Sequence, residues 1–278
     1  MAARVSDAGR LVVCATPIGN LEDVTLRVLG ALREADVIAC EDTRRTRKLL
    51  DRYGIRAPLV SYHEHNEERR AAELVERMQG GAVVALVSDA GMPLISDPGY
   101  VLVRACVAAG VAVEVLPGPS AALAALVASG LPADHWRFEG FLPRRAGDLR
   151  RVLASSGAAT LVAFESPHRL AATLRVLADL DRERPAAVCR ELTKVHEEVV
   201  RGTAGELADR FAKAAPRGEV VLVVGAAAER PGGDDGPSPD AVDAVARLVE
   251  AGAKPRAAAS VVAELTGESA NALYRAVL

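Results

Sequence analysis

Three segments rich in glycine and proline carry the groups in this chain best suited to bind a small ligand. They are Thr16–Asn20, Ser88–Gly99 and Leu116–Ala121, with the sequences TPIGN, SDAGMPLISDPG and LPGPSA. Each follows an apolar run of strand length, and ligands of open α/β sheets bind beyond the carboxyl ends of the strands. We therefore expect the three loops to converge on one cleft. Their exposed backbone N–H and C=O groups suit an adenine ring and an amino-acid group better than a triphosphate.

Other common kinds of site are absent from the sequence. It contains neither a GxxxxGKS or GxxxxGKT loop nor a GxGxxG turn, which are the usual glycine motifs that cradle phosphates. Its cysteines, Cys14, Cys40, Cys106 and Cys189, lie far apart, with no CxxC pair and no nearby histidine cluster. They are expected to be small buried hydrophobic residues in a reducing compartment, and no metal site is predicted.

Two groups of basic residues follow predicted strands and are candidates to contact phosphates. The first is Arg44, Arg45, Arg47 and Lys48, and the second is Arg144, Arg145, Arg150 and Arg151. Such runs also occur as solvated helix faces, so both interpretations stay open. The formal net charge of −3 excludes a protein that coats nucleic acid by charge alone, so any RNA contact must be local. Aromatic residues make up only 3% of the chain, which leaves few platforms on which single bases can stack.

The elements that position these residues alternate from Arg10 onward between strand-like and helical runs, as in a βα-wound lobe with a mostly parallel sheet. The predicted strands are Arg10–Pro17, Asp36–Asp42, Leu59–His63, Ala82–Asp89 and Val111–Pro117. The predicted helices are Thr25–Glu34, Arg44–Tyr53, Glu67–Gln79 and Tyr100–Ala109. Gly54, Gly80 and Gly110 stand where left-handed C-caps are expected.

A second α/β lobe begins with an Ala/Leu helix at Ser120–Ser129 and contains a mixed sheet. Its predicted strands are Arg137–Pro143, Thr160–Glu165, Ala186–Leu192, Glu198–Thr203 and Gly218–Gly225. Only Thr193 to Glu197 separate the third of these from the fourth. That is too few residues for a crossover helix, so the two strands are expected to be antiparallel. Trp136 is expected in the core.

The chain ends in a small helical appendage. A segment rich in Pro, Gly and Asp predicts a linker, and three helices follow at Pro239–Glu250, Pro255–Leu265 and Ser269–Leu278. The predicted domains are the N-terminal α/β lobe at 10–119, the second α/β lobe at 120–228, the linker at 229–238 and the appendage at 239–278. No segment has the length of apolar sequence that spans a membrane, and the first residues lack the apolar stretch of a signal peptide. A cytoplasmic protein is expected.

Eight strings in this order give the chain a likeness to a known family. They are TPIGNLEDVTLR (Thr16–Arg27), CEDTRRT (Cys40–Thr46), SYHEHNE (Ser61–Glu67), SDAGMPLISDPG (Ser88–Gly99), LPGPSA (Leu116–Ala121), EGFLPR (Glu139–Arg144), FESPHRL (Phe164–Leu170) and RELTKVHEE (Arg190–Glu198). The chain resembles the bacterial ribosomal RNA small subunit methyltransferase I family, a branch of the tetrapyrrole methylases, from about Leu11 to Gly225.

The resemblance implies two α/β lobes with S-adenosylmethionine between them, and a homodimer. It implies 2′-O-methylation of a cytidine ribose in the decoding region of 16S rRNA within the small ribosomal subunit. There are two alternatives, a methylase of precorrin or uroporphyrinogen rings and a non-catalytic module that docks on the ribosome. The EDTR and ESPHR strings argue against the first alternative. Tight cofactor binding without turnover would favour the second alternative.

The resemblance also assigns cofactor contacts in both lobes. In the first lobe they are Pro17, Asp89, Gly91, Met92, Ser120 and Ala121, and in the second they are Glu165 and Leu192. Met92 stands where the family often has Thr, so a backbone contact is expected there in place of a side-chain hydroxyl. Ser120 and Ala121 begin a helix, whose free N–H groups can bind a carboxylate or a ribose oxygen.

A ribose hydroxyl is a poor nucleophile, so a residue must take its proton or stabilise the alkoxide. The candidates at strand ends are unranked: Glu41, Asp42, Glu165, Glu191 and Lys194. RNA contacts are expected from Arg44, Arg45, Arg47, Lys48 and Arg144. The histidines inside the family strings, His63, His65, His168 and His196, are expected to have structural roles.

Overall fold

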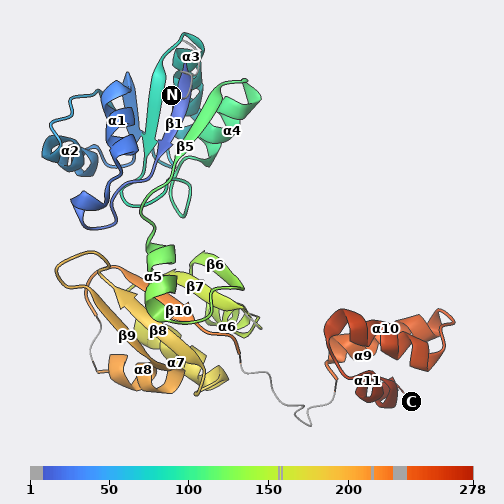
Figure 1. Ribbon diagram of the computed structural model, residues 1–278. Coiled ribbons are helices and arrows are strands. Elements are labelled where there is room, and N and C mark those ends of the chain that lie inside the picture. The colour runs from blue at the N-terminus through green and yellow to red at the C-terminus, as the bar shows by residue number, and fades with distance from the viewer. Residues whose placement is uncertain (1–8, 156, 158, 214–215, 228–236, 278) are drawn as a thin grey trace. The chain divides into compact units, whose positions relative to one another are not determined.

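A computed structural model describes residues 9–155, 157, 159–213, 216–227 and 237–277 of the chain (Figure 1). The chain divides into two compact units, Met1–Ala227 and Ala228–Leu278. The larger unit contains two α/β lobes, and the smaller one contains three helices. Of the predicted linker at 229–238, residues 229–236 lie outside the described residues. In the described part of the chain, no helix is long and apolar enough to cross a membrane.

The first lobe is built on a five-stranded parallel sheet with the order β3-β2-β4-β1-β5 (Figure 1). Its strands are β1 (Arg10–Cys14), β2 (Val37–Cys40), β3 (Leu59–Ser61), β4 (Val83–Val87) and β5 (Ala112–Leu116). Its helices are α1 (Leu26–Glu34), α2 (Thr43–Arg52), α3 (Glu67–Gln79) and α4 (Tyr100–Ala108), and a 3₁₀ turn, η1 (Leu21–Asp23), precedes α1. The parallel sheet predicted for this lobe is confirmed.

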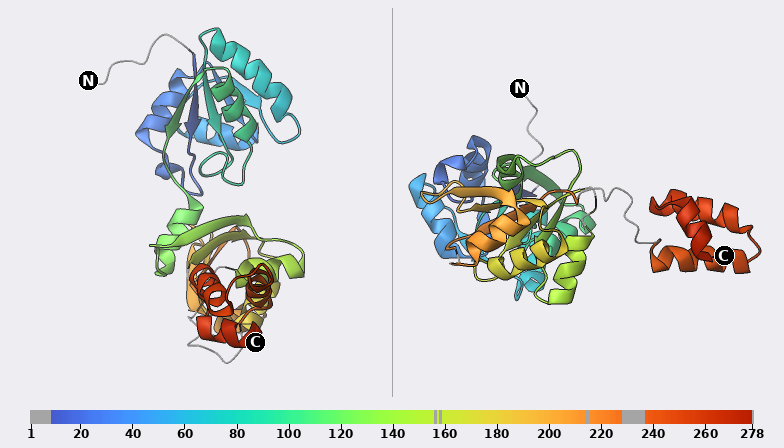
Figure 2. Two further views of the ribbon diagram at one scale, coloured as in Figure 1. Left: turned by 90° about the vertical axis from the view of Figure 1, so that its right-hand side faces the viewer. Right: turned by 90° about the horizontal axis from the view of Figure 1, so that it is seen from below.

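Both faces of this sheet are covered, which explains why its strands are continuous apolar runs. Val12 and Cys14 of β1 pack with α1 and α2 on one face. The alternate residues Leu11 and Val13 pack with α3 and α4 on the other face, because successive side chains of a strand point in opposite directions. Figure 2 shows helices on both sides of the sheet in this lobe.

The second lobe has a mixed sheet with the order β6-β7-β10-β8-β9. Its strands are β6 (Trp136–Phe141), β7 (Thr160–Glu165), β8 (Pro185–Arg190), β9 (Glu198–Thr203) and β10 (Val220–Val224). β6 runs parallel to β7, and every other pair is antiparallel. The antiparallel pairing predicted for β8 and β9 is therefore confirmed. Helix α5 (Ala121–Ser129) covers one face, and α6 (Ala146–Ala154), α7 (Leu170–Leu180) and α8 (Ala204–Phe211) cover the other.

Several predicted strands extend too far toward their carboxyl ends. The prediction Arg10–Pro17 is the clearest case, because β1 ends at Cys14 and Thr16 instead pairs with Gly91 in an isolated antiparallel bridge. β2, β3, β4, β5, β6, β8 and β10 also stop before the predicted residue. The strand-like sequence pattern continues past the observed end of each strand. The backbone there no longer makes the hydrogen bonds of the sheet and forms loops instead.

One of the three predicted glycine caps is wrong. Gly54 and Gly110 have φ of 63° and 68°, and they end α2 and α4 as predicted. Gly80 keeps a φ of −79°, because its N–H still bonds to the carbonyl of Glu76, and the left-handed residue is Gly81 with φ of 97°. Glycine at two successive positions allows the left-handed turn after α3 to fall at Gly81, one residue later than predicted.

The three C-terminal helices form a unit with its own core. They are α9 (Pro239–Glu250), α10 (Pro255–Thr266) and α11 (Ala270–Val277), so the three-helix appendage is confirmed. Val245, Ala259, Val262 and Leu273 are at most 4% exposed in its centre. Glu268, in the break between α10 and α11, accepts hydrogen bonds from the N–H and hydroxyl of Ser238. This contact closes the unit at the start of α9.

Two expectations about burial have opposite outcomes. All four cysteines are free and buried, as predicted. Trp136 was expected in the core, but it begins β6 at the edge of the second sheet and is 37% exposed. An edge strand leaves one side of its residues without a neighbouring strand, which is why an apolar side chain there is not fully covered.

Candidate functional site

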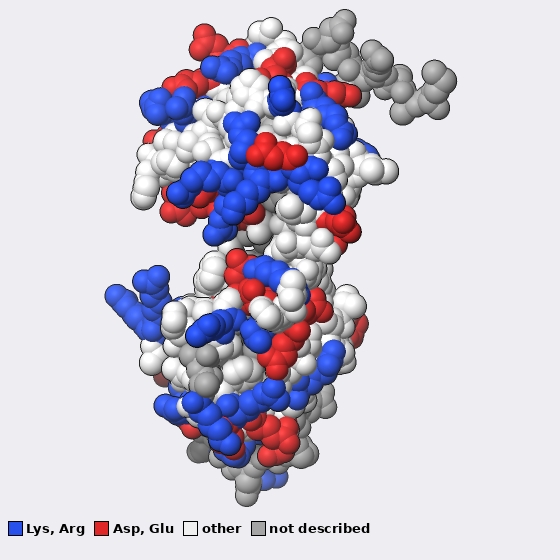
Figure 3. All heavy atoms as spheres, turned by 90° about the vertical axis from the view of Figure 1, so that its left-hand side faces the viewer, with Lys and Arg blue, Asp and Glu red and all other residues white. Residues whose placement is uncertain are grey.

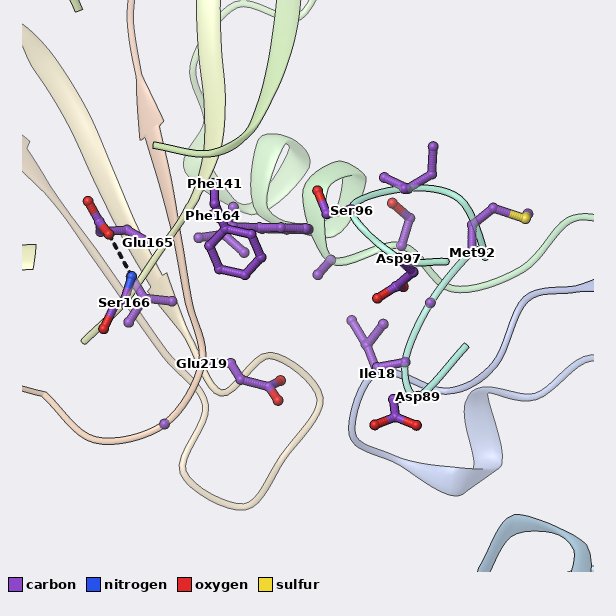
Figure 4. Close-up of a pocket in the computed structure, with 18 of the residues that line it drawn as sticks. Ile18, Asp89, Met92, Ser96, Asp97, Phe141, Phe164, Glu165, Ser166 and Glu219 are labelled. Carbon is purple, nitrogen blue, oxygen red and sulfur yellow. Dashed lines mark hydrogen bonds between the residues drawn. The ribbon is translucent and has the colours of Figure 1, made fainter. Parts of the chain in front are cut away.

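A cavity of about 460 Å³ lies at the carboxyl ends of the first-lobe strands and is closed by residues of the second lobe. Its first-lobe lining comprises Ile18, Glu41, Arg45, residues 89–92 and residues 95–97, and Ser120 and Ala121 line it from the start of α5. Its second-lobe lining comprises Phe141, residues 164–167 and residues 218–221. Figure 4 shows Phe141 and Phe164 on one side of the cavity and Ile18, Asp89, Met92 and Asp97 on the other, while the carboxylate of Glu165 points away from the space between them.

The three loops rich in glycine and proline converge at this cavity. The N–H and carbonyl groups of Thr16 exchange hydrogen bonds of 2.8 and 2.9 Å with those of Gly91. The Thr16 hydroxyl also donates to the carbonyl oxygen of Ser88 at 3.1 Å. A Cβ added at Gly91 would lie 3.6 Å from Ile18 Cγ2 and 3.8 Å from the Pro119 carbonyl oxygen. Gly91, whose φ is 80°, therefore stands where all three loops meet.

Most of the residues predicted to contact a cofactor line this cavity. Asp89, Gly91, Met92, Ser120, Ala121 and Glu165 are in the lining. Pro17 and Leu192 are not in the described lining, although Leu192 packs against Ile18 in the core between α5 and the second sheet. Ser120 caps α5, because its hydroxyl accepts the N–H of Leu123 at 3.5 Å.

The Asp89 carboxylate already has partners from its own lobe. Its Oδ1 accepts the backbone N–H of Asp42 at 3.0 Å, and its Oδ2 lies 3.3 Å from a guanidinium nitrogen of Arg45. Asp89 thus ties the end of β4 to the start of α2, and Arg45 balances part of its charge.

Asp97 and Glu41 are the carboxyl groups in the lining whose pKa values are raised. Burial is the main cause for Asp97, and with the charges of Glu41 and Asp89 it raises the pKa of this residue to about 6. Burial also raises the pKa of Glu41, and the charge of Asp89 adds to the effect. No ion pair of either carboxylate is present among the described residues. These two groups are therefore stronger bases than exposed carboxylates.

The Glu165 carboxylate is buried and has three partners. It accepts the N–H of Ser166 at 2.7 Å and the hydroxyl of Thr173 at 2.5 Å. A guanidinium nitrogen of Arg169 lies 3.4 Å from its Oε1. These contacts fix the turn between β7 and α7, so the carboxylate has a structural role in addition to its place in the lining.

The other predicted catalytic groups lie outside the described lining. Lys194 Nζ donates to Glu191 at 2.9 Å and to Glu219 at 3.0 Å. The bond from Lys194 holds the pKa of Glu191 below its usual value. The bonds from Arg44 lower the pKa of Asp42, which caps α2, to about 2. Carboxylates held ionised in this way are weak proton acceptors.

The predicted RNA-contacting residues differ in whether their charge is balanced. Arg44 pairs with Asp42, and Arg45 pairs with Asp89. Arg47, Lys48 and Arg144 are exposed, and no ion pair of theirs occurs in the part of the chain that the structure describes. Figure 3 shows Lys and Arg side chains gathered low on the first lobe, on the side where α2 lies in Figure 1.

Two loops beside the cavity contain backbone conformations that side chains rarely adopt. Leu94 and Ser96 have φ of 74° and 64°, and Glu191 and Thr193 have φ of 49° and 66°. Positive φ in non-glycine residues costs about 1–3 kcal/mol at each position and concentrates at functional sites. The first pair of residues sets the direction of the loop that carries Asp97.

Asp97 and Phe141 line the cavity but were not predicted as site residues, although both lie inside strings that carry the family resemblance. The signal for Asp97 was its place in SDAGMPLISDPG, where it is the second aspartate of one strand-end loop. The signal for Phe141 was an aromatic residue next to Gly140 in a chain poor in aromatics. Neither signal says that the side chain lines a cavity, which depends on local backbone turns.

The donor set of the cavity fits a nucleoside joined to an amino acid. Phe164, Ile18 and Val221 provide apolar surface for a ring, and the N-terminus of α5 provides N–H groups for a carboxylate. Aspartate and glutamate side chains in the lining suit a positively charged group such as an ammonium or sulfonium. No group of histidine, cysteine or acidic residues arranged to hold a metal ion occurs in the described residues.

Comparisons with known proteins agree on one family. The sequence profile described as Tetrapyrrole (Corrin/Porphyrin) Methylases matches residues 10–208. The chain is 49% identical to Ribosomal RNA small subunit methyltransferase I of Mesorhizobium japonicum over 272 residues, which are 96% of this chain and 91% of that protein.

Solved structures of tetrapyrrole methylases have a similar fold. A uroporphyrin-III-C-methyltransferase from Thermus thermophilus matches with a TM-score of 0.57 and 26% identity, over 78% of this chain and 94% of that one. A uroporphyrin-III C-methyltransferase from the same organism, complexed with S-adenyl homocysteine, matches with a TM-score of 0.55 and 23% identity over 78% and 97% of the two chains.

Proposed function

Because the chain belongs to the tetrapyrrole methylase family, we propose that it methylates the ribose 2′-hydroxyl of a cytidine in the decoding region of 16S rRNA. The cofactor is S-adenosylmethionine. The observation that carries the proposal is the 49% identity, over 96% of the chain, to a protein named ribosomal RNA small subunit methyltransferase I. The substrate is the small ribosomal subunit, and the protein acts as a homodimer in the cytoplasm.

The cofactor would be held mainly by the first lobe. Gly91, Met92, Ser120 and Ala121 offer backbone groups at the cavity, and Glu165 closes it from the second lobe. When bound, S-adenosylmethionine supplies a methyl group on a positively charged sulfur. The carboxylates of the lining favour that charge, because unlike charges attract strongly in a site with little water. Pro17, Asp89 and Leu192 complete the predicted set, and Leu192 belongs to the same buried cluster as Ile18.

Glu41 is the proton acceptor that the geometry favours among the five predicted candidates. Asp42, Glu191 and Lys194 lie outside the described lining, and Glu165 is saturated with partners. Glu41 lines the cavity at the end of β2 and has a raised pKa. A carboxylate with a raised pKa is better suited to take the proton of a hydroxyl group during methyl transfer. The negative charge of Asp89 adds to the effect of burial on the pKa of Glu41.

RNA contacts are assigned to the exposed cations beside the cavity. Arg47, Lys48 and Arg144 have charge that no described acid balances, so they can pair with phosphates. Arg44 and Arg45 are proposed as weaker contacts, since each already pairs with an aspartate. A few such contacts suit a protein whose net charge is −3.

A methylase of tetrapyrrole rings remains the second candidate, because the similar solved structures include such enzymes. The lining argues against it. Five acids and one arginine line the cavity, and the acids are Glu41, Asp89, Asp97, Glu165 and Glu219. A macrocycle that carries several carboxylates would be repelled there. A ribose hydroxyl is neutral, and its phosphates can stay outside the cavity.

The test compares two acceptors under the same conditions. Small subunits from a strain that lacks this protein, and separately uroporphyrinogen, are incubated with the protein and methyl-labelled S-adenosylmethionine. We expect label in the 16S rRNA and none in the macrocycle. Label in the macrocycle alone would favour the second candidate, and cofactor binding without label in either acceptor would favour a non-catalytic ribosome-docking module.

A further inference from the structure

Phe141 is an aromatic side chain that the fold leaves open at the edge of the cavity. It is 64% exposed, and it lines the cavity together with Phe164. Tyr100 and Trp136 are the other large aromatic side chains exposed in the described part of the chain, and neither is in the lining. Single exposed apolar residues are common on protein surfaces, so exposure alone does not indicate a role for Phe141. The backbone around Phe141 gives further evidence.

A β-bulge turns Phe141 toward the cavity. Phe138 pairs with Val162 and Phe141 pairs with Phe164, so β6 has one residue more than β7 between these pairs. Gly140 lies inside the bulge with φ of 63°, a left-handed conformation that glycine adopts without steric cost. Because side chains alternate along a strand, the extra residue places Phe141 on the same face as Phe164. Bulges of this kind occur beside active sites, where they redirect a side chain.

The bulge also touches the opposite lobe. A Cβ added at Gly140 would lie 3.1 Å from the hydroxyl oxygen of Ser96, in the loop that carries Asp97. Gly140 therefore allows this close approach as well as the turn.

Contacts from behind fix the Phe141 ring and its backbone. The rings of Phe141 and Phe164 are 5.5 Å apart with an interplanar angle of 62°, an edge contact that leaves most of Phe141 exposed. Arg169 donates to the carbonyl oxygens of Leu142 at 3.1 Å and Pro143 at 2.5 Å. A ring held in this way loses little conformational freedom when a ligand stacks on it.

The distribution of charge places RNA at this edge and not deeper in the cavity. The interior carries the carboxylates of Glu41 and Asp97, which repel phosphates. Arg144 and Arg145 follow Phe141 closely in sequence and are exposed. An exposed aromatic ring followed in sequence by exposed arginines offers a stacking surface for a base and cations for its phosphate.

We propose that Phe141 stacks on the base of the nucleotide whose ribose is methylated and so holds that nucleotide at the mouth of the cavity. This inference rests on the proposed function, because it takes the substrate to be RNA. It adds a positioning residue in the second lobe to a reaction whose proton acceptor lies in the first. The base must leave its stack to reach the ring, and aromatic side chains commonly accept bases displaced in this way.

Crosslinking tests the contact without turnover. A photoreactive p-azido-phenylalanine replaces Phe141 in one variant and Trp136 in a matched control, which stands on the same strand outside the lining. Each variant is irradiated with unmethylated small subunits and radiolabelled S-adenosylhomocysteine. We expect the variant at 141 to crosslink to 16S rRNA at the methylated nucleotide and the control not to do so. Absence of an RNA crosslink, or capture of the labelled cofactor product instead, would overturn the proposal.

Kinetics test whether the contact contributes to the reaction. Phe141→Leu keeps apolar volume without a ring, and kcat/KM for small subunits is expected to fall by about 10-fold or more, the size for losing one stacked base. Phe141→Trp should restore it, and the affinity for S-adenosylhomocysteine should be the same in all three proteins. Parental kcat/KM in Phe141→Leu, or a parallel loss of cofactor affinity, would contradict the stacking. Parental protein that never methylates subunits would instead contradict the proposed function.

Discussion

The two lobes build the same cavity from different materials. The parallel sheet of the first lobe ends several strands at one edge, and the loops there bring Glu41, Asp89 and Asp97 together. The mixed sheet of the second lobe contributes the rings of Phe141 and Phe164 and two carboxylates, both with partners of their own. Glu165 accepts hydrogen bonds from Ser166 and Thr173, and Glu219 accepts one from Lys194. The first lobe therefore supplies charge and basicity, and the second supplies shape. Strand direction explains the difference, since only parallel neighbours end at a common edge.

The largest effect is expected from removing the first-lobe base. Glu41→Gln should lower the rate of methyl transfer to small subunits by about 10²–10⁴-fold, the usual contribution of a positioned acid or base. The affinity for S-adenosylhomocysteine, measured by calorimetry, should stay at the parental value. Glu191→Gln is the matched second-lobe variant, and it should keep most of the activity because Lys194 holds Glu191 ionised. Equal losses in the two variants would remove the distinction between the lobes.

Removing the second-lobe carboxylate should affect stability more than chemistry. Glu165→Ala leaves Arg169 without its buried partner and frees the Thr173 hydroxyl, so the free energy of unfolding should fall by about 3–5 kcal/mol. Thr173→Val removes one of these bonds and should cost about 1–3 kcal/mol. Urea denaturation measures both variants. An unchanged midpoint for Glu165→Ala would show that this carboxylate does not hold the turn between β7 and α7.

The acidic lining should make the first lobe sensitive to pH through Asp97. Its pKa is raised to about 6 in the folded protein, so the folded state binds a proton more tightly than the unfolded chain. Stability from this group is therefore present at low pH and is lost as pH rises toward and past 6. Asp97→Asn should raise the free energy of unfolding at pH 7.5 by about 1–2 kcal/mol, allowing for partial exposure, and the gain should shrink toward pH 4. A gain that does not change between these pH values would contradict the shift.

A smaller effect is expected from the unpaired cations of α2. Arg47→Ala should reduce the log–log salt slope of subunit binding by roughly 0.7, the value for one phosphate contact on a single strand. Arg44→Ala is the control on the same helix, and it should reduce the slope less because Arg44 already pairs with Asp42. Titrations at several salt concentrations give both slopes. A parental slope for Arg47→Ala would assign that residue to a solvated face.

Removing 239–278 should have the least effect on the cavity. The three helices have their own core around Val245 and Leu273, and they form a separate compact unit. We expect the shortened protein to fold, dimerise and bind S-adenosylhomocysteine as before, while its methylation of small subunits falls because a second contact is lost. Loss of cofactor affinity or of dimerisation would show that the three helices have a structural role. Methylation at the parental rate would show that the reaction does not need them.

The sequence was sufficient to predict what depends on periodicity and chain connection. The parallel first sheet, the antiparallel β8 and β9 and the three C-terminal helices follow from repeat length and loop length. The strand ends were less predictable. Thr16 continues the strand-like run of β1 in the sequence, but its backbone pairs with Gly91 outside the parallel sheet. The left-handed turn at Gly81 instead of Gly80 was decided by one hydrogen bond that continues α3.

The site was predictable as a meeting of loops but not as a set of side-chain roles. Glu41 and Glu165 stood as equal candidates, because the buried partners of Glu165 come from Ser166, Thr173 and Arg169 after folding. Phe141 reaches the cavity through a bulge, which shifts a side chain from one face of the sheet to the other. No pattern in one sequence specifies such a shift.

The position of the transferred methyl group distinguishes ribose methylation from methylation of a base. Small subunits lacking the modification are treated with the protein and isotope-labelled S-adenosylmethionine, and the 16S rRNA is digested to nucleosides for mass spectrometry. The proposed 2′-O-methylation predicts one labelled nucleoside, a cytidine whose extra methyl group stays with the ribose fragment, and no label with Glu41→Gln. A methyl group on a base, a labelled nucleoside other than cytidine, or full labelling by Glu41→Gln would contradict it.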